Sequence, residues 1–376
     1  MQTGPLENEE EKEKVGWFPM NSMFETNENF PKGLPVPQRA DILDALRSFG
    51  IEEAETIRLI DSTRNPADVR LNFIVDNKWV LRYCIAPDMT EKRLGELEKL
   101  VERYNAMGIK CPRFLTDSWG RYLHIWRQMQ YYLTEYIDLP LAGDEDIKDK
   151  ARLTREVQDS VARFAEKNRN ANLTSTMGMY SLFDLSPFDC PNGIDEKEDN
   201  FNQLINLLRK EHENKIADSL VMRHAEIREK LRGIYRDLPR CVFQGDENFS
   251  NVLTDENQHF AGFIDFNLAG TEVIVNQLVN LAGFDYDEEH KEPEGAYLRL
   301  NKALLNYQEQ MRSMLRIYRP TERERQAIVW YAWIVMVSQW PTLNYFRDAM
   351  QGKLKTEILS LLSLIATLPE EQLSVI

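Results

Sequence analysis

Three polar residues near the middle of the chain combine residue types and spacing that suit one kind of chemistry. Asp246 is followed five residues later by Asn251, and Asp265 closes an apolar run after a short polar turn. A carboxylate can accept the proton of an attacking hydroxyl, while an amide oxygen and a second carboxylate can hold Mg²⁺ against nucleotide phosphates. The set therefore predicts Asp246 as the base of a phosphoryl transfer and Asn251 with Asp265 as metal ligands. An acidic β-hairpin with solvated turns is the plainer alternative.

The elements that must position these side chains are short. Residues 241–243, 251–254 and 260–265 are rich in β-branched and aromatic residues between polar turns, a pattern that predicts strands. The turn between the last two runs is made of acid and amide residues, which favour reversal of the chain. A hairpin of this length would let Asn251 and Asp265 face one point from opposite strands.

This stretch resembles the aminoglycoside phosphotransferase and choline kinase group of small-molecule kinases, which are relatives of the eukaryotic protein kinases. That group has a loop of the form His-Gly-Asp-x-x-x-x-Asn and a metal strand Ile-Asp-Phe or Ile-Asp-Trp; this chain has Gln244-Gly245-Asp246 and Ile264-Asp265-Phe266. Gln244 replaces a His that orients the loop, and Asn280 replaces an Asp in an Asp-Leu-Ala sequence. The resemblance implies transfer of the γ-phosphoryl group of ATP, or GTP, to a small-molecule hydroxyl with Mg²⁺.

Upstream, three strands are predicted between residues 56 and 84, with a two-residue Asp-Asn hairpin turn between the second and third. The connection 61–68 lies where a kinase fold places its nucleotide loop, and it contains no glycine. Contact with phosphates would therefore depend on Ser62, Thr63 and Asn65 and their amides. A plain polar turn is the alternative.

The resemblance also assigns a phosphate-binding cation and its partner. Arg82, in the third predicted strand, stands in the place of the lysine that neutralises the α- and β-phosphates, a task that Arg can perform bidentately. The following helix, predicted over residues 90–107, offers Glu98 or Glu96 as the ion-pair partner. The spacing from Arg82 favours Glu98.

The last strand of the predicted sheet runs into a linker. In kinases the linker backbone hydrogen-bonds the adenine edge, so the resemblance places Glu135, Tyr136 and Ile137 at the base of the nucleotide. Because backbone groups make these bonds, the sequence carries little trace of them.

The order of parts predicts an α+β, bilobal, protein kinase-like fold, with a small antiparallel sheet followed by a large and mainly helical lobe. We expect a partly disordered arm over residues 1–35, a nucleotide-binding lobe over 36–137, and a catalytic and substrate-binding lobe over 138–376. Within the last, residues 170–199 form a long irregular segment. Such segments are often functional, so this one is either a lid over the substrate or an insertion.

Composition excludes several classes of partner. The chain has 376 residues, with 46 basic against 61 acidic, for a net charge of −15. Nucleic acid is not expected as a partner, because phosphate backbones require a basic footprint. No apolar run approaches the roughly 18 residues of a membrane span, and no signal peptide is evident.

Four scattered cysteines without C-x-x-C spacing favour a reducing, cytoplasmic location. They are Cys84, Cys111, Cys190 and Cys241.

The acceptor is predicted from charge. Five carboxylates would lie near the catalytic residue: Glu247, Asp285, Asp287, Glu288 and Glu289. They favour a cationic alcohol such as an amino sugar, an aminoglycoside or a choline-like compound, although the last four are also consistent with a solvated turn.

The competing class of protein is a pseudokinase that binds a nucleotide or ligand with little turnover. Four substituted positions leave it open: the glycine-free loop, Arg82, Gln244 and Asn280. The sequence leaves the oligomeric state unknown.

Overall fold

A computed structural model describes residues 24–189, 192–286 and 292–375, which divide into two compact units. The first unit takes in the described part of Met1–Gly95 together with Pro112–Asp138. The second takes in Glu96–Cys111 and the described part of Leu139–Ile376. The described part of the chain therefore begins in the first unit, contributes residues 96–111 to the second, returns to the first, and continues in the second from Leu139 onward.

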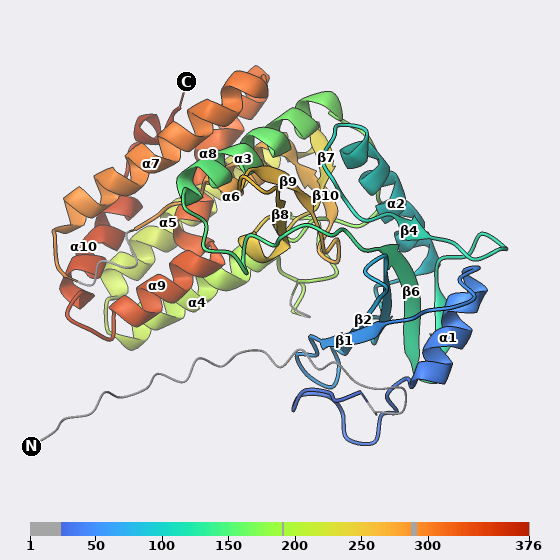
Figure 1. Ribbon diagram of the computed structural model, residues 1–376. Helices are drawn as coiled ribbons and strands as arrows, with labels where there is room; N and C mark the ends of the chain where they lie inside the picture. Colours follow the sequence, from blue (N-terminus) through green and yellow to red (C-terminus); the bar gives the residue numbers. More distant parts are fainter. Residues whose placement is uncertain (1–23, 190–191, 287–291, 376) are drawn as a thin grey trace, which may run out of the picture. The chain divides into compact units, whose positions relative to one another are not determined.

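The first unit is built on a six-stranded antiparallel sheet in the order β1-β2-β3-β6-β4, with β5 paired to β6 (Figure 1). Asp76 and Asn77 have φ of +52° and +49°, the left-handed conformation of a tight hairpin turn, which confirms the turn predicted between β2 and β3. The strands are β1 (Ile57–Asp61), β2 (Arg70–Val75), β3 (Trp79–Cys84), β4 (Phe114–Leu115), β5 (His124–Trp126) and β6 (Met129–Glu135).

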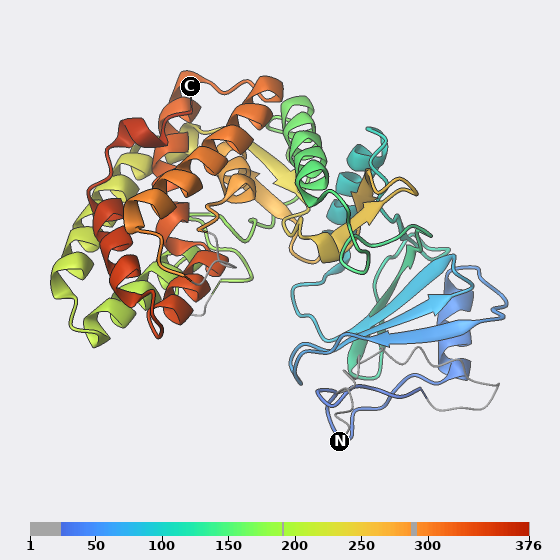
Figure 2. The same cartoon turned by 60° about the vertical axis from the view of Figure 1, so that its left-hand side comes forward.

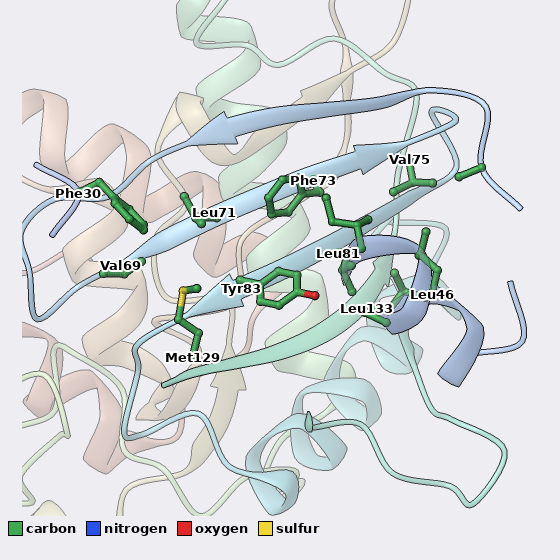
Figure 3. Close-up of a cluster of buried hydrophobic side chains, with 13 residues drawn as sticks. Phe30, Leu46, Val69, Leu71, Phe73, Val75, Leu81, Tyr83, Met129 and Leu133 are labelled. Atoms are coloured by element: carbon green, nitrogen blue, oxygen red, sulfur yellow. The ribbon is translucent and has the colours of Figure 1, made fainter. Parts of the chain in front are cut away.

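One face of this sheet packs on helix α1 (Arg39–Ser48) and on the segment before it (Figure 3). Phe73 of β2 has its ring edge against Phe24, with centroids 5.1 Å apart, and Phe30 is buried in the same cluster. The described part of the predicted arm, residues 24–35, therefore packs against the sheet. The stretch predicted to be disordered, residues 1–14, lies outside the described residues.

One segment of this unit has the sequence pattern of a longer strand than the one that forms. The sequence of residues 122–129 predicts a single strand, but β5 ends at Trp126 and β6 begins at Met129. Arg127 between them has φ of +54°, so the chain reverses there. A turn built on Arg127 and Gln128 carries neither Gly nor Asn, the residues that usually mark such a reversal.

Helix α2 (Glu91–Asn105) contains the boundary between the two units. Its C-terminal half is fixed within the second unit. The Asn105 side chain exchanges two hydrogen bonds of 2.9 Å with the backbone of Cys111, and Lys110 N–H donates to Ala261 O at 2.9 Å. Gly262 must be glycine here, because a Cβ on it would lie 1.8 Å from Lys110 O.

The second unit is mainly helical and carries two short β-ladders, β7 with β10 and β8 with β9 (Figure 2). The strands are β7 (Arg240–Phe243), β8 (Val252–Thr254), β9 (Phe260–Phe263) and β10 (Gly270–Val273). The helices are α3 (Lys150–Lys167), α4 (Glu196–Lys210), α5 (Asn214–Ile234), α6 (Ile274–Ala282), α7 (Ala296–Ile317), α8 (Glu322–Ser338), α9 (Trp340–Ala349) and α10 (Lys355–Ala366).

Helix α8 is the centre of this unit. Its N-terminus has the predicted capping box, in which the Thr321 and Glu324 side chains bond to each other's backbone N–H. It packs against α4, α5 and α6, which explains why it is apolar nearly all round. Its apolar sequence predicts a helix that extends to Gln339. Helix α8 ends at Ser338, and α9 begins at Trp340 with Pro341 in its first turn, where a missing N–H costs nothing.

No helix among the described residues is long and apolar enough to cross a membrane.

Candidate active site

The site begins where β7 ends. Gly245 has φ of +87°, and a Cβ on it would lie 2.6 Å from Leu268 O, so both its backbone conformation and the space around it require glycine. This tight turn places Gln244 inside the unit and leaves Asp246 half-exposed at the surface of the loop.

Gln244 joins the two halves of the candidate site. Its side chain is fully buried, and its Nε2 donates to Ile264 O at 3.0 Å and to Asp265 O at 2.6 Å. Its Oε1 accepts the N–H of Asp246 at 2.7 Å. One amide thus fixes the backbone of Asp246 to the backbone of Asp265. The predicted ability of Gln to donate and accept in place of His agrees with these contacts.

Gln244→Leu should lower both stability and turnover. The substitution keeps the approximate volume but leaves a partly buried N–H and two partly buried carbonyls without this partner, at up to about 1–3 kcal/mol for each group that stays unsatisfied. We expect a loss of at least about 2 kcal/mol in the free energy of unfolding, measured with urea, and a lower kcat. Gln244→His should recover part of both, because neutral imidazole has one donor and one acceptor. The control Gln351→Leu, at an exposed position, should match wild type. A Gln244→Leu variant as stable as wild type would show that the amide does not hold the loop.

Asp246 and Asn251 are hydrogen-bonded to each other. Asn251, 8% exposed, donates through Nδ2 to the Oδ2 and the backbone O of Asp246, both at 2.9 Å. Asn248 Nδ2 donates to Asp246 Oδ1 at 2.6 Å. These donors fix the orientation of the carboxylate. Because the Asn251 nitrogen is used toward Asp246, its Oδ1 is the atom left to bind a cation.

Asp265 follows β9 and is brought to Asn251 by the backbone, since Ile264 N–H donates to Asn251 O at 2.9 Å. Asp265 has φ of +55°, unusual for a residue with a side chain, and its Oδ1 accepts Asn267 N–H at 3.1 Å. The hairpin predicted to bring Asn251 and Asp265 together has formed. A carboxylate and an amide oxygen from adjacent backbones are donors that suit a hard cation.

No group of three or more His, Cys, Asp or Glu side chains suitable for a metal occurs in the described part of the chain. A site of one carboxylate and one amide would therefore leave most of the coordination sphere to phosphate and water. That is the usual manner of Mg²⁺, which keeps several waters and binds through one or two protein ligands plus substrate phosphates.

Glu247, next to the candidate base, is held by a residue that the sequence did not single out. Gln277 on α6 donates through Nε2 to both Glu247 oxygens, at 3.1 and 3.0 Å, and Gly245 N–H also donates to the carboxylate. Burial raises the pKa of Glu247 to about 7. Asn280, the residue aligned with the Asp of Asp-Leu-Ala, instead bonds within α6 to Asn276. The side chain that reaches the loop lies one helical turn earlier.

Glu272 on β10 should make stability fall as pH rises. It is 1% exposed, and burial raises its pKa from 4.5 to about 8. Between these values the unfolded chain is ionised at this residue while the folded chain is not, so unfolding releases a proton. Stability then falls by about 1.4 kcal/mol per pH unit across this window. In urea unfolding at several pH values, Glu272→Gln should flatten the slope relative to wild type. Glu256→Gln in the exposed turn should not, and equal slopes for wild type and Glu272→Gln would contradict the assignment.

In the first unit, the polar side chains of the predicted phosphate loop already make hydrogen bonds. Thr63 Oγ1 accepts Arg70 N–H at 3.1 Å, Asn65 Oδ1 accepts Ala67 N–H at 2.9 Å, and Ser62 Oγ accepts from Asn72 at 3.2 Å. These three side chains are therefore already hydrogen-bonded. The backbone N–H groups of Ser62 and Thr63 are bonded as well, to Arg70 O and to Asp61 Oδ1, both at 2.9 Å. Contact of Ser62, Thr63 and Asn65 with phosphates stays a prediction.

The predicted adenine-binding residues end the sheet. Glu135 N–H donates to Arg113 O at 2.9 Å, and Tyr136 N–H donates to Lys78 O at 2.8 Å. Two of the three linker N–H groups are therefore already hydrogen-bonded within the first unit. The predicted contact with adenine would be left to the N–H of Ile137 and to the carbonyl groups of the three residues.

Arg82 is half-buried in β3, opposite Asn72 on β2 and Tyr132 on β6. Of its two candidate partners, Glu96 is engaged within the second unit, where it accepts from Thr174 Oγ1 at 2.8 Å. Glu98 is 5% exposed, and a buried carboxylate requires a compensating donor or cation. The Arg82–Glu98 pair remains a prediction, with Glu96 as its alternative.

An antiparallel-sheet unit and a larger, mainly helical unit that holds Asp246, Asn251 and Asp265 make up the α+β architecture that the sequence predicts. That prediction is confirmed at the level of the fold.

No protein-family model matches the chain, and no curated protein matches it. The solved structures that it resembles include a spectinomycin phosphotransferase with ADP and spectinomycin (10% identity, 89% of this chain and 99% of that one, TM-score 0.49). They also include a microcompartment-associated aminopropanol kinase (11%, 89% and 97%, 0.48) and an amicoumacin kinase with AMP-PNP and Ca²⁺ (10%, 90% and 95%, 0.48). Because identities and TM-scores are low, function has to be argued from the site.

Proposed function

We propose that this chain is a nucleotide-dependent phosphotransferase that acts on the hydroxyl group of a small molecule. The observation that carries the proposal is the Gln244 amide, which couples the backbones of Asp246 and Asp265 while Asn251 orients the Asp246 carboxylate. If this stretch were only an acidic hairpin with solvated turns, nothing would require a fully buried side chain such as Gln244 to link its two parts. The arrangement suits a site that must hold a base and two metal ligands in fixed positions.

In this reaction Asp246 accepts the proton of the acceptor hydroxyl as its oxygen bonds to the γ-phosphorus. The bond from that phosphorus to the β,γ-bridging oxygen breaks, and the nucleoside diphosphate leaves with the electron pair. Asn251 and Asp265 would hold Mg²⁺, which supplies neutralisation of the phosphate charge. Gln244 keeps the base and the metal ligands in register throughout.

The first unit would bind the nucleotide. Arg82, paired with Glu98, is the proposed phosphate-binding cation; the linker residues Glu135, Tyr136 and Ile137 are proposed to contact the base, and the turn with Ser62, Thr63 and Asn65 the phosphates. ATP and GTP are both compatible with these assignments.

Arg82→Ala should raise the nucleotide KM and lower kcat together. Loss of a charged phosphate contact typically costs about 1.5–3 kcal/mol, or roughly 10–100-fold in kcat/KM. Arg82→Lys should retain much of the activity, because the main task is neutralisation of charge. Lys78→Ala, at the exposed β2–β3 turn, is the matched control. Full activity of Arg82→Ala would remove this residue from the site.

The finer prediction, a cationic acceptor, depends on how many carboxylates remain available. Glu247 is engaged by Gln277, Asp285 is exposed, and Asp287, Glu288 and Glu289 lie outside the described residues. We keep an amine-bearing alcohol as the first class to test. Its kcat/KM should fall as salt is raised if the acidic groups steer it.

The test is turnover of Mg²⁺–ATP and Mg²⁺–GTP against a panel of cationic, neutral and anionic hydroxylated metabolites, with phosphorylated product detected by mass spectrometry. The phosphotransferase function predicts acceptor-dependent product that Asp246→Ala does not form. Nucleotide binding without product for any acceptor would favour the pseudokinase alternative, and absence of nucleotide binding would contradict both.

A further inference from the structure

A buried ammonium group lies close to the candidate catalytic loop, within the second unit. Lys197, the second residue of α4, is 1% exposed, and its Nζ lies 4.6 Å from the centroid of the Tyr180 ring. The same Nζ donates to Glu196 Oε2 at 2.8 Å, and Asn200 Nδ2 holds the other oxygen of that carboxylate at 2.7 Å. Because a buried ammonium is costly unless it is paired, the chain has built a cation site here.

This cation site is connected to Asp246 through α6. Asn276 donates to Tyr180 O at 2.7 Å, and its neighbour Gln277 donates to both oxygens of Glu247, the residue after Asp246. Burial, followed by the nearby carboxylates of Glu247 and others that include Asp246, raises the pKa of Tyr180. Two neighbouring residues of α6, Asn276 and Gln277, therefore connect Tyr180 to the loop that would receive the acceptor.

A second feature near Tyr180, the buried carboxyl group of Glu272, indicates that a further polar group could be bound there. Glu272 is 1% exposed; its Oε1 accepts Val273 N–H, while its Oε2 has no hydrogen-bond partner among the described residues. This Oε2 lies beside Gly178, two residues before Tyr180, where a Cβ added to Gly178 would be 3.4 Å from it. A buried carboxyl oxygen without a partner costs free energy, so it marks a position suited to a polar group.

We propose that Tyr180, Glu196 and Glu272 form an ammonium subsite of the acceptor-binding region, and that Lys197, by filling it, is a specificity-determining residue. The inference rests on the proposed phosphotransferase function. With Lys197 in place, an acceptor must present a neutral group toward Tyr180 and carry any amine elsewhere. Without the Lys197 ammonium, the same position would receive an amine of the acceptor.

The subsite is tested by chemical rescue, independently of phosphoryl transfer. Lys197→Ala removes the atoms of n-propylammonium, so this ion is the probe. At roughly ten times its dissociation constant it should raise the melting temperature of Lys197→Ala by about 2–4 °C relative to equal NaCl. It should not do so for wild type, and 1-propanol, its neutral counterpart, should not do so for the variant. The exposed Lys215→Ala is the matched control.

Specificity is tested with Lys197→Met, which keeps the hydrocarbon stem and therefore the packing. Against pairs of acceptors that differ only by amine or hydroxyl, its kcat/KM ratio for amine over hydroxyl should exceed the wild-type ratio at least about tenfold. If propylammonium acts no better than NaCl on Lys197→Ala, the subsite is refuted. If the ratio is unchanged in Lys197→Met, the specificity role is refuted. If no acceptor is phosphorylated, the function fails, while the rescue experiment still decides the subsite.

Discussion

Asp246→Ala should abolish phosphoryl transfer while leaving nucleotide binding nearly intact. A positioned general base typically contributes about 10²–10⁴-fold to kcat, and we expect a loss in that range. The metal ligand beside it should remain in place, because Asn251 Nδ2 keeps its 2.9 Å hydrogen bond to the backbone O of residue 246 when the carboxylate is removed. The measurements are single-turnover kinetics and calorimetric titration with Mg²⁺ and a nucleotide analogue.

The control for this substitution is Asp144→Ala, which removes an exposed carboxylate from the same unit. It should leave kcat and the nucleotide dissociation constant unchanged. An Asp246→Ala variant with more than about a tenth of wild-type kcat would be incompatible with a general base, and the proton would have to pass to another group or to water.

Asp265→Ala should have the opposite signature, with loss of Mg²⁺-dependent nucleotide binding. Even partners that only orient a metal ligand typically contribute 10–100-fold to metal affinity, so loss of the ligand itself should weaken Mg²⁺–nucleotide binding by at least about that factor. The residue left behind would also have to keep φ near +55°, which is unfavourable for Ala. Asp265→Asn is therefore a useful second variant, since Asn tolerates this conformation better.

Calorimetry with Mg²⁺ and with EDTA separates the metal contribution from contacts of the nucleotide with the protein. In Asp265→Ala the two affinities should converge, whereas the exposed Glu256→Ala should keep the wild-type difference. Equal Mg²⁺ dependence in Asp265→Ala and wild type would remove Asp265 from the metal site and would leave Asn251 without a carboxylate partner.

The parts of the fold that were predicted correctly are those encoded by neighbouring residues. Strong alternation and the Asp76-Asn77 turn define the hairpin of β2 and β3, and the Thr321–Glu324 capping box defines the start of α8. Strand β10 was not predicted, because it has no alternating pattern of its own and exists through pairing with β7. Helix α9 was not predicted as a separate helix; it begins two residues after α8 ends, with Pro341 in its first turn, where proline is well tolerated.

The same distinction applies to the candidate site. Asp246, Asn251 and Asp265 lie in one short stretch of the chain, residues 246–265, so their spacing in the sequence carries the prediction. Gln277, which holds Glu247, comes from 30 residues farther along, and no local pattern distinguishes it from other helical amides. The contact of Glu96 with Thr174, 78 residues away, likewise has no trace in the local sequence. Side chains that serve a site across large separations become visible only in the folded chain.

The interleaving of the two units has a consequence for dissecting the protein. A fragment that begins after Asp138 would lack residues 96–111, and with them Tyr104, whose ring stacks on Phe164 at 3.9 Å and whose hydroxyl accepts Gln244 N–H. It would also lose the backbone pairing of Lys110 with β9. Such a truncation should be insoluble or aggregate, and its refolding should be restored by adding a peptide of residues 96–111. During synthesis, Tyr104 leaves the ribosome 60 residues before Phe164 and 140 residues before Gln244, so this stretch must wait for both partners.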